Sequence, residues 1–424
     1  MSHWTGTHDP RFTDRAAHRQ WLISEALDLI ALFQRSALNP EGGFFTLDTN
    51  GAPNPPARAD AGDVRQLHDT TRLVHCFAIA HLLGLPGAER FVDHGMRFLR
   101  SRHHDPANGG YFWSVDDTGP ADSSKQAYGH AFVILAASSA QIVGHPDAKA
   151  LFEDAMAVLE RRFWDESVGA TTEEYTADWQ PLGDYRGQNS NMHLTEALMA
   201  AFEAFGDRRH LTMAERIAEL VIDRHARAEG WRVPEHFTAD WEVDRDYAGD
   251  PMFRPSGTTP GHALEWSRLL VQLWESGQRE KAWLLEAAEA LFRSTVESAW
   301  DEAHGGFYYT LGWDDAPERT DRYWWPCAEG IGAAAVLSEA TGGAPQYELW
   351  YRRIWGFVAN HVIDHMHGGW FPELDAALRP AYRVFAGKPD LYHALQACLI
   401  PLLPSTGSVT HGLAGTGLRP DTGR

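Results

Sequence analysis

A glycine–aromatic signature recurs six times along this chain of 424 residues, at nearly even intervals. The six copies are Gly42-Gly43-Phe44-Phe45, Gly109-Gly110-Tyr111-Phe112, the degenerate Val168-Gly169, Gly230-Trp231, Gly305-Gly306-Phe307-Tyr308 and Gly368-Gly369-Trp370-Phe371. Each copy precedes a long stretch whose apolar residues recur with the period of an α-helix. A repeat of this length indicates one supersecondary unit that the chain uses six times.

Hydrophobic periodicity predicts two helices in each repeat. They span residues 15–36, 64–84, 87–101, 125–143, 147–163, 189–206, 208–226, 260–276, 279–298, 322–340, 343–363 and 387–402. Every second helix is apolar nearly all round, whereas the others have one charged face. This alternation predicts an all-α fold of two concentric rings, an (α/α)6 barrel with short β-hairpins between helices. An open α-solenoid is the alternative, but solenoid repeats are usually shorter and do not gather polar residues at one end of each inner helix.

The unbroken repeat and the composition limit the domain organisation and the partners. We expect one catalytic barrel domain over residues 1–404 and a flexible tail over 405–424, which is rich in Gly, Thr and Pro. A net charge of −21 argues against nucleic acid and an anionic membrane as partners. Three scattered cysteines and the lack of a long apolar stretch predict a cytoplasmic protein without disulfides. The exposed helix faces are compatible with a monomer or with several kinds of interface.

Polar side chains gather at the first turns of the predicted inner helices. In such a barrel all inner helices run in the same direction, so these side chains should meet at one mouth. Buried polar groups cost about 1–3 kcal/mol each unless they are paired, so the cluster predicts the lining of a wet pocket. Its members include His130, His193, His262, His393, Arg72 and Glu329.

His262 lies at a well-marked helix start, because Thr259 is a good N-cap residue and Pro260 suits the first helical position. The positive end of the helix dipole favours the neutral, proton-accepting imidazole there. Glu265 follows three residues later on the same helical face, so we expect it to orient the His262 ring. The alternative for Glu265 is an ion pair with a nearby arginine.

Two other chemistries are compatible with these residue types. Several histidines in one cup could bind zinc, but no HExxH pair occurs and basic side chains share the cluster, so we expect no metal. Two carboxylates could serve a glycosidase, yet histidines dominate the cluster, and their unperturbed pKa of about 6.5 suits proton shuttling better. The neighbouring aromatic residues suit either sugar stacking or core packing; they are Trp324, Trp325, Tyr128, Tyr392 and Trp370.

Five segments resemble motifs of the N-acylglucosamine 2-epimerase superfamily, nearest to its aldose–ketose isomerase branch. The resemblance covers roughly residues 15–403, and the motifs occur in the same order. The segments are Arg72-Leu73-Val74-His75, Ser124-Lys125-Gln126-x-Tyr128-x-His130, Asn189-x-Asn191-Met192-His193, Thr259-Pro260-Gly261-His262-x-x-Glu265-Trp266 and Asp390-x-Tyr392-His393.

The resemblance implies an enzyme that isomerises or epimerises unphosphorylated sugars at C2 without a metal or redox cofactor. His262 and His393 match the two acid/base histidines of the family. The positions that match its substrate pocket are Arg72, Asn189, His193, Trp325 and Glu329, with Glu265 supporting His262. Lys125, Tyr128 and His130 match a further shared motif.

Three departures from the sulfoquinovose isomerases of this branch bear on the substrate. Pro372 and Pro389 stand where those enzymes have glutamine, and His68 stands where they have tryptophan. Losing two amide donors favours a neutral hexose over a sulfonate. We therefore expect interconversion of D-mannose and D-fructose, and also of D-lyxose and D-xylulose, through a cis-enediolate. In this scheme His393 moves the proton between C2 and C1, His262 serves ring opening, and Arg72 stabilises the enediolate.

The alternatives lie in different classes of protein. A sugar 2-epimerase would use the same two histidines and return the proton to the opposite face of C2. A hydrolase or a sulfoquinovose isomerase on the same barrel is less favoured by the residues. A non-catalytic carbohydrate-binding barrel would bind sugar without isotope exchange at C2.

Overall fold

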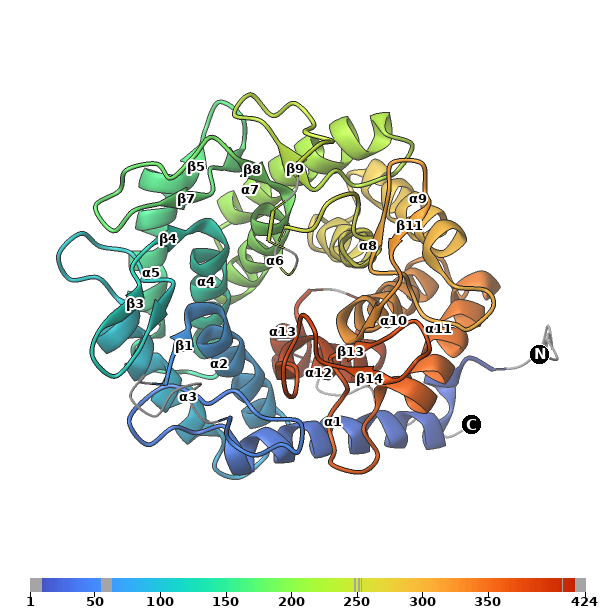
Figure 1. The fold of residues 1–424 in the computed structure, drawn as a ribbon, viewed down its shortest axis with the longest axis horizontal. Coiled ribbons are helices and arrows are strands. Elements are labelled where there is room, and N and C mark those ends of the chain that lie inside the picture. The colour runs from blue at the N-terminus through green and yellow to red at the C-terminus, as the bar shows by residue number, and fades with distance from the viewer. Residues whose placement is uncertain are drawn as a thin grey trace.

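The chain folds as an (α/α)6 barrel, in which an inner and an outer ring of helices alternate along the sequence (Figure 1). The computed structural model describes residues 10–54, 63–247, 249–250, 252, 254–405 and 407–415. The inner helices are α2 (Leu67–Leu82), α4 (Ala127–Ile142), α6 (Gln188–Phe205), α8 (Pro260–Ser276), α10 (Trp324–Ala340) and α12 (Leu391–Leu399). The outer helices are α1 (Ala16–Ser36), α3 (Ala88–Phe98), α5 (Ala148–Val158), α7 (Arg209–Ala218), α9 (Ala282–Ala299) and α11 (Pro345–Phe357).

The two rings differ in burial as the hydrophobic pattern predicts. Residues 129–140 of α4 are all buried between its neighbours. In α3 only one face is buried, with Phe91, Val92 and Met96 inward and charged residues such as Glu89 and Arg90 outward. The apolar stripe of each outer helix therefore packs on the inner ring, and a continuous core fills the space between the rings.

Four outer helices end in a widened turn of π-helix just before the next hairpin. These turns are η2 (Leu99–His103), η3 (Leu159–Phe163), η4 (Glu219–Ala226) and η5 (Val358–Val362). Shorter 3-10 segments occur at η1 (Phe12–Asp14) and η6 (Ile400–Leu402). None of the helices in the described part of the chain is long and apolar enough to cross a membrane.

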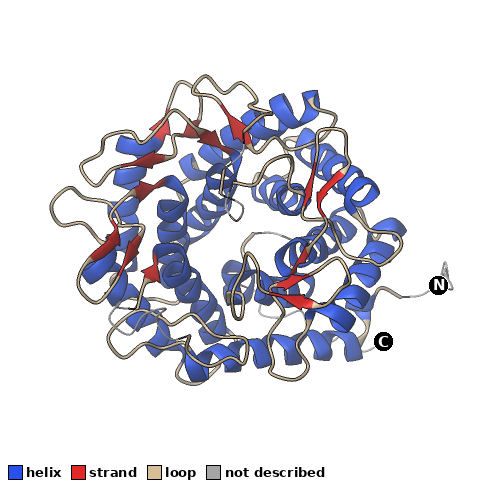
Figure 2. Ribbon diagram, in the orientation of Figure 1, coloured by secondary structure: helices blue, strands red, loops and turns tan. Residues whose placement is uncertain are grey.

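Short antiparallel strands join each inner-helix start to the hairpin of the following unit, on one face of the ring (Figure 2). The sheets are β1 (Arg65–Gln66) with β2 (Ser114–Val115) and β3 (Pro120–Asp122), β4 (Lys125–Gln126) with β7 (Glu174–Tyr175), β5 (Trp164–Asp165) with β6 (Ala170–Thr171), β8 (Arg186–Gly187) with β9 (His236–Phe237), β10 (Thr310–Leu311) with β11 (Pro317–Arg319), and β12 (Arg322–Tyr323) with β13 (Glu373–Leu374) and β14 (Pro380–Ala381). Single bridges complete the pattern at Thr258–Leu311 and Leu47–Lys388. The last of these joins the first hairpin to the last inner helix and so closes the ring.

The repeated signature is a turn that a buried ion pair ties to the next inner helix. Gly109 and Gly110 have φ values of 76° and 74°, a left-handed conformation that glycine adopts without a steric penalty. The Asp105 carboxylate accepts hydrogen bonds from the backbone of the turn, and its Oδ2 lies 2.8 Å from Lys125 Nζ. The same arrangement recurs with Asp301–Arg322 and Asp364–Lys388.

The predicted helices agree with the observed ones except at several inner-helix starts. Residues predicted as the beginning of these helices, near 64, 125, 322 and 387, form the strands or bridges described above, and the helices begin two to four residues later. The cause is tertiary pairing with the neighbouring hairpin, which local periodicity does not reveal.

The prediction of a flexible tail over 405–424 is wrong for the residues that the structure describes. Residues 409–415 form α13 (Val409–Gly415), which packs against α2, α4 and α6. Val409 and Leu413 are buried one turn apart, and the Ser408 hydroxyl accepts a hydrogen bond from the His411 backbone at the helix start. The Gly and Thr content concealed this short apolar face. Residues 416–424 lie outside the described part.

Candidate active site

A cavity of about 360 Å³ opens where the inner helices begin, which is a size typical of small-molecule sites. Seven of the eight residues that the sequence predicts for the site line it: Arg72, Asn189, His193, His262, Glu265, Trp325 and His393. The inner helices therefore do bring their polar first turns to one mouth. Glu329, the eighth residue, is buried behind the lining.

His262 lies in the first turn of α8 and is held by a carboxylate. Its Nδ1 is 2.9 Å from each oxygen of Glu235. Because a carboxylate only accepts hydrogen bonds, Nδ1 donates to Glu235, which leaves Nε2 as the ring nitrogen that faces away from the carboxylate. Glu235 also accepts from Gln188 Nε2 at 2.8 Å and from the backbone N–H of Thr259 at 3.2 Å.

Glu235, and not Glu265, is the carboxylate that orients His262, so that prediction is wrong. Side chains on a helix point toward its N-terminus, and the His262 ring therefore reaches beyond the helix start, away from the following turn. Glu235 lies just before β9, in a segment whose local pattern carries no helical or metal-site signal. Glu265 instead contacts Arg268, which is the alternative that the sequence left open.

His393 lies in the first turn of α12, where the Asp390 carboxylate caps the helix by accepting from the Tyr392 backbone at 3.0 Å. Nδ1 of His393 donates to Glu329 Oε1 at 2.8 Å, and Arg268 Nε donates to the other Glu329 oxygen at 2.8 Å. Burial acts to raise the pKa of Glu329, but Arg268 and His393 hold that pKa down to about 2. Glu329 was predicted to bind substrate; the structure instead makes it the buried partner of His393.

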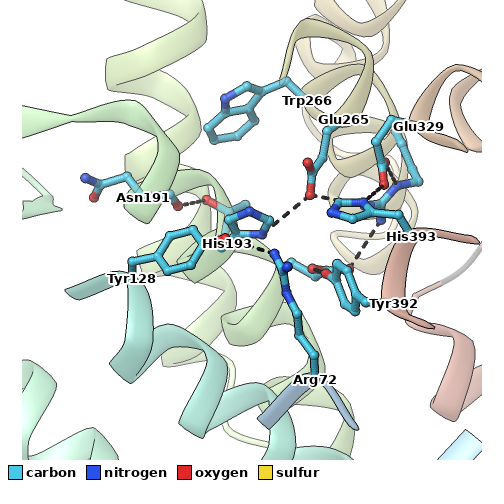
Figure 3. Close-up of polar contacts among 12 residues, drawn as sticks. Arg72, Tyr128, Asn191, His193, Glu265, Trp266, Glu329, Tyr392 and His393 are labelled. Atoms are coloured by element: carbon cyan, nitrogen blue, oxygen red, sulfur yellow. Dashed lines mark hydrogen bonds and ion pairs between the residues drawn. The ribbon is translucent and has the colours of Figure 1, made fainter. Parts of the chain in front are cut away.

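Arg268 is surrounded by three buried carboxylates (Figure 3 shows two of them, Glu265 and Glu329). Besides the bond to Glu329, its Nη1 is 3.4 Å from Glu196 and its Nη2 is 3.5 Å from Glu265. The Tyr392 hydroxyl donates to Glu196. Burial and the negative charge of Glu329 raise the pKa of Glu265 well above its usual range. Glu265 therefore takes up a proton more readily than an ordinary glutamate, on the wall of the cavity.

Arg72 places a guanidinium on the cavity wall from the second turn of α2. Its Nη1 donates to Asp390 Oδ2 at 2.7 Å and its Nη2 donates to the Tyr128 hydroxyl at 2.9 Å. The guanidinium carbon also lies 4.4 Å from the centre of the Phe132 ring. These contacts fix the guanidinium while it remains on the cavity wall, where it can stabilise developing negative charge.

Two polar side chains of α6 face the same space. Burial and the charge of Arg72 lower the pKa of His193 well below its usual range, so this imidazole is neutral. Its Nδ1 lies 3.5 Å from Glu265 Oε1. The Asn189 Oδ1 atom is buried and has no hydrogen-bond partner among the described residues. A ligand hydroxyl is the group that would satisfy this oxygen.

Trp325 brings the two candidate acid/base histidines onto one wall. The centre of its ring system lies 5.0 Å from the His262 ring and 5.9 Å from the His393 ring. Gly261 permits this packing, because a Cβ atom there would come within 2.3 Å of the indole. The two imidazoles therefore flank a single indole, although they come from helices more than a hundred residues apart.

The predicted cluster also contains side chains that do not reach the cavity. Lys125 is fully buried in its ion pair with Asp105. His130 accepts from the Tyr111 backbone and donates to the Gln126 carbonyl, so both ring nitrogens are used within the fold. Of the three residues in this motif, Tyr128 alone lines the cavity.

Two groups of side chains in the described chain have atoms close enough to hold a metal ion, namely His193–Glu196–Glu265 and Glu265–Glu329–His393. Arg268 contacts all three of these glutamates. A divalent cation placed there would lie beside a guanidinium that already compensates the carboxylates. The donor set therefore fits an arginine-centred cluster better than a metal site.

Comparisons with known proteins agree with this geometry. The sequence profile of the N-acylglucosamine 2-epimerase (GlcNAc 2-epimerase) family matches residues 42–397. The chain is 45% identical to a D-mannose isomerase of Thermobifida fusca, over 96% of this chain and 99% of that protein. It is 42% identical to a D-mannose isomerase of Pseudomonas cannabina pv. alisalensis, over 94% and 96%. A crystal structure of D-mannose isomerase superposes with a TM-score of 0.84 at 34% identity, covering 92% of this chain and 98% of that one.

Proposed function

The chain belongs to the N-acylglucosamine 2-epimerase family, and from this membership and the cavity we propose that it is an aldose–ketose isomerase that interconverts D-mannose and D-fructose. We extend the proposal to D-lyxose and D-xylulose, which have the same configuration at the reacting carbons. The observation that carries it is the pair of imidazoles, His262 and His393, each held by a buried carboxylate on the wall of one cavity. Arg72 and Asn189 supply a charge and an acceptor for sugar oxygens beside them.

The proposed reaction moves two protons within an open-chain sugar. His262 first assists ring opening by passing a proton from the O1 hydroxyl to the ring oxygen. His393 Nε2 then removes the C2 proton, and His262 relays the O2 proton toward O1, which gives a cis-enediolate. Return of the carried proton from His393 to C1 yields the ketose, and Arg72 stabilises the negative oxygens of the intermediate.

The two carboxylates support this chemistry by fixing the imidazole tautomers. With Nδ1 donating to Glu235 or Glu329, the Nε2 lone pair of each ring is the one available to a substrate proton. The same carboxylate stabilises the imidazolium that forms when the ring takes that proton. Because the pKa of Glu329 lies at about 2, it stays ionised across the working pH range.

The test is incubation of the protein with D-mannose in heavy water, followed by NMR. We expect fructose that carries deuterium at C1 wherever the transferred proton exchanges with solvent. His393→Asn should lose turnover and isotope exchange while its circular dichroism spectrum matches the parent. Turnover of this variant close to that of the parent would contradict the assignment, and glucose in place of fructose would identify a 2-epimerase.

A further inference from the structure

We propose that the C-terminal segment, residues 407–415, is a positioning element for His393 that acts through Gln272, Arg268 and Glu329. The proposal rests on the function proposed above, in which His393 carries the proton between C2 and C1. None of the residues of the segment lines the cavity. Its effect passes through a continuous chain of buried hydrogen bonds.

The chain of contacts runs through the inside of the barrel. Gln272 Nε2 donates to the Gly407 carbonyl at 2.8 Å, and Gln272 Oε1 accepts from Arg268 Nη1 at 3.1 Å. Arg268 Nε donates to Glu329 at 2.8 Å, and Glu329 accepts from His393 Nδ1 at 2.8 Å. All four side chains are buried, so water does not compete for these bonds.

The segment is itself fixed at the end of the barrel opposite the mouth. The Ser408 backbone and hydroxyl donate to Glu203 at 2.9 and 2.5 Å. Gly407 has φ +97°, and a Cβ atom there would come within 1.9 Å of Glu203, so no other residue fits without displacement. Val409 and Leu413 are buried, and α13 lies within the ring of inner helices, where it packs against α2, α4 and α6 (Figure 1). The Gly407 carbonyl is thus held at a defined place.

Arg268 needs such an anchor because three carboxylates compete for one guanidinium. Gln272 and Glu329 bind Nη1 and Nε, and together they set the plane of the group. Without Gly407, the Gln272 amide would be free to turn, and Arg268 could swing toward Glu196 or Glu265. Glu329 would then release the His393 ring from its orientation. A displacement of about 1 Å at a reacting group can cost about 100-fold in rate.

The experiment compares two truncations and one point variant in the full isomerase assay. A chain ending at residue 415 is the control and should match the parent. A chain ending at residue 404 and the variant Gln272→Leu should each lose about tenfold in kcat, the lower end of what removal of an outer positioning partner costs. We expect KM to stay within about twofold, because Arg72 and Asn189 are untouched. A synthetic peptide of residues 405–415 should restore activity to the shortened chain but not to Gln272→Leu.

Combining the two changes tests whether they act through one chain of contacts. The truncated Gln272→Leu protein should be no less active than the less active of the two single variants. The second change removes a contact that the first has already broken. Losses that multiply would overturn the proposal. A truncation that lowers only the melting temperature and leaves kcat unchanged would overturn it as well. If the shortened chain does not fold, the kcat of Gln272→Leu alone tests the proposal, and an unchanged kcat would overturn it.

A second readout separates this proposal from the proposed function. In spectra of ¹⁵N-histidine-labelled protein, the Nδ1–H signal of His393 should shift in the truncation and in Gln272→Leu, while that of His262 should stay in place. An unchanged His393 signal in both variants overturns the positioning role. A parent that converts no mannose but gives the expected shifts refutes the isomerase assignment and leaves the positioning role standing.

Discussion

The two histidines of the cavity have the same immediate partner, a buried carboxylate on Nδ1, but the surroundings of the two carboxylates differ. Glu235, on the His262 side, is held by neutral donors, the Gln188 amide and the Thr259 backbone. Glu329, on the His393 side, is held by the Arg268 guanidinium. The carboxylate that orients His262 is therefore held by neutral hydrogen bonds, and the carboxylate that orients His393 is held by an ion pair.

The difference matters because buried charges depend on one another more strongly than buried amides do. Burial acts to raise the pKa of Glu235, but His262, His236 and the Gln188 amide together hold that pKa below its usual range. Glu329 reaches a pKa of about 2 because a permanent cation adds to the effect of its histidine. The His393 side should therefore tolerate substitution less well, in stability as well as in rate.

The largest contrast is expected when the group behind each carboxylate is removed. Arg268→Met leaves three buried carboxylates without their cation and should cost about 3–5 kcal/mol in the free energy of unfolding. Gln188→Leu removes a neutral donor and should cost about 1–3 kcal/mol. Urea denaturation of both variants measures the two costs. Equal losses would mean that Arg268 does not compensate the cluster as the geometry indicates.

Removing the charge of each carboxylate should sharpen the contrast in rate. Glu329→Gln has one oxygen to offer two obligate donors, Arg268 and His393 Nδ1, so one bond is lost, and kcat should fall about 100-fold. At Glu235→Gln the remaining oxygen can still accept from both His262 Nδ1 and the Thr259 backbone, and only the neutral Gln188 amide loses its acceptor, so about tenfold is expected. Steady-state kinetics on mannose measures both values. A larger loss at position 235 would reverse the comparison.

Much of the fold could be predicted because its determinants are local and repeated. The inner and outer helices differ in apolar pattern, and every copy of the repeated turn has at least one glycine in a left-handed conformation. The starts near 125 and 322 were misplaced because Lys125 and Arg322 pair with distant hairpins. The described part of the tail was misjudged because two buried residues, Val409 and Leu413, outweigh its glycine content.

The cavity wall could be predicted from one argument, that the inner helices share a direction and their polar starts converge. What lies behind the wall could not. Glu235 lies 27 residues before His262 in the sequence. The pairing of β8 with β9 brings the two side chains together. From the sequence alone Arg268 would be predicted to lie on the surface, because arginine is seldom buried. In the structure its side chain is only 1% exposed. Contacts of this kind depend on tertiary structure and leave no local pattern.

The C-terminal segment adds a pH dependence to the His393 side. Burial raises the pKa of Glu203 from its usual value to about 7. A carboxyl whose pKa is raised by folding stabilises the protein fully below its unfolded value, and this contribution is lost as the pH rises from about 4.5 through 7. Over this range the free energy of unfolding of the parent should therefore fall by about 2 kcal/mol relative to that of Glu203→Gln. A tenfold change in proton affinity is worth about 1.4 kcal/mol, and partial exposure of the side chain reduces the total.

Unfolding free energies at pH 5 and pH 8 measure the effect at Glu203. Glutamine can still accept from Ser408, so Glu203→Gln should keep the segment docked and its kcat close to that of the parent. Parallel stability curves for the two proteins would show that the carboxyl is already ionised at pH 5. On the His262 side, burial also raises the pKa of Glu173, which accepts from the Gly187 backbone next to Gln188, to about 7, and the comparison of the parent with Glu203→Gln isolates the contribution of Glu203 from it.

The smallest effect should come from the outermost contact on the His262 side. Trp266 Nε1 donates to Gln188 Oε1 at 2.7 Å, and this bond orients the amide that holds Glu235. Trp266→Phe removes one neutral hydrogen bond and should cost about 1 kcal/mol beyond the lost ring volume, with a fall in kcat of only about threefold. Trp300→Phe is the matched control, because Trp300 is also buried and its Nε1 has no partner among the described residues. If the two variants lose the same stability and the same rate, the amide does not need this anchor, and Glu235 is held by Gln188 and Thr259 alone.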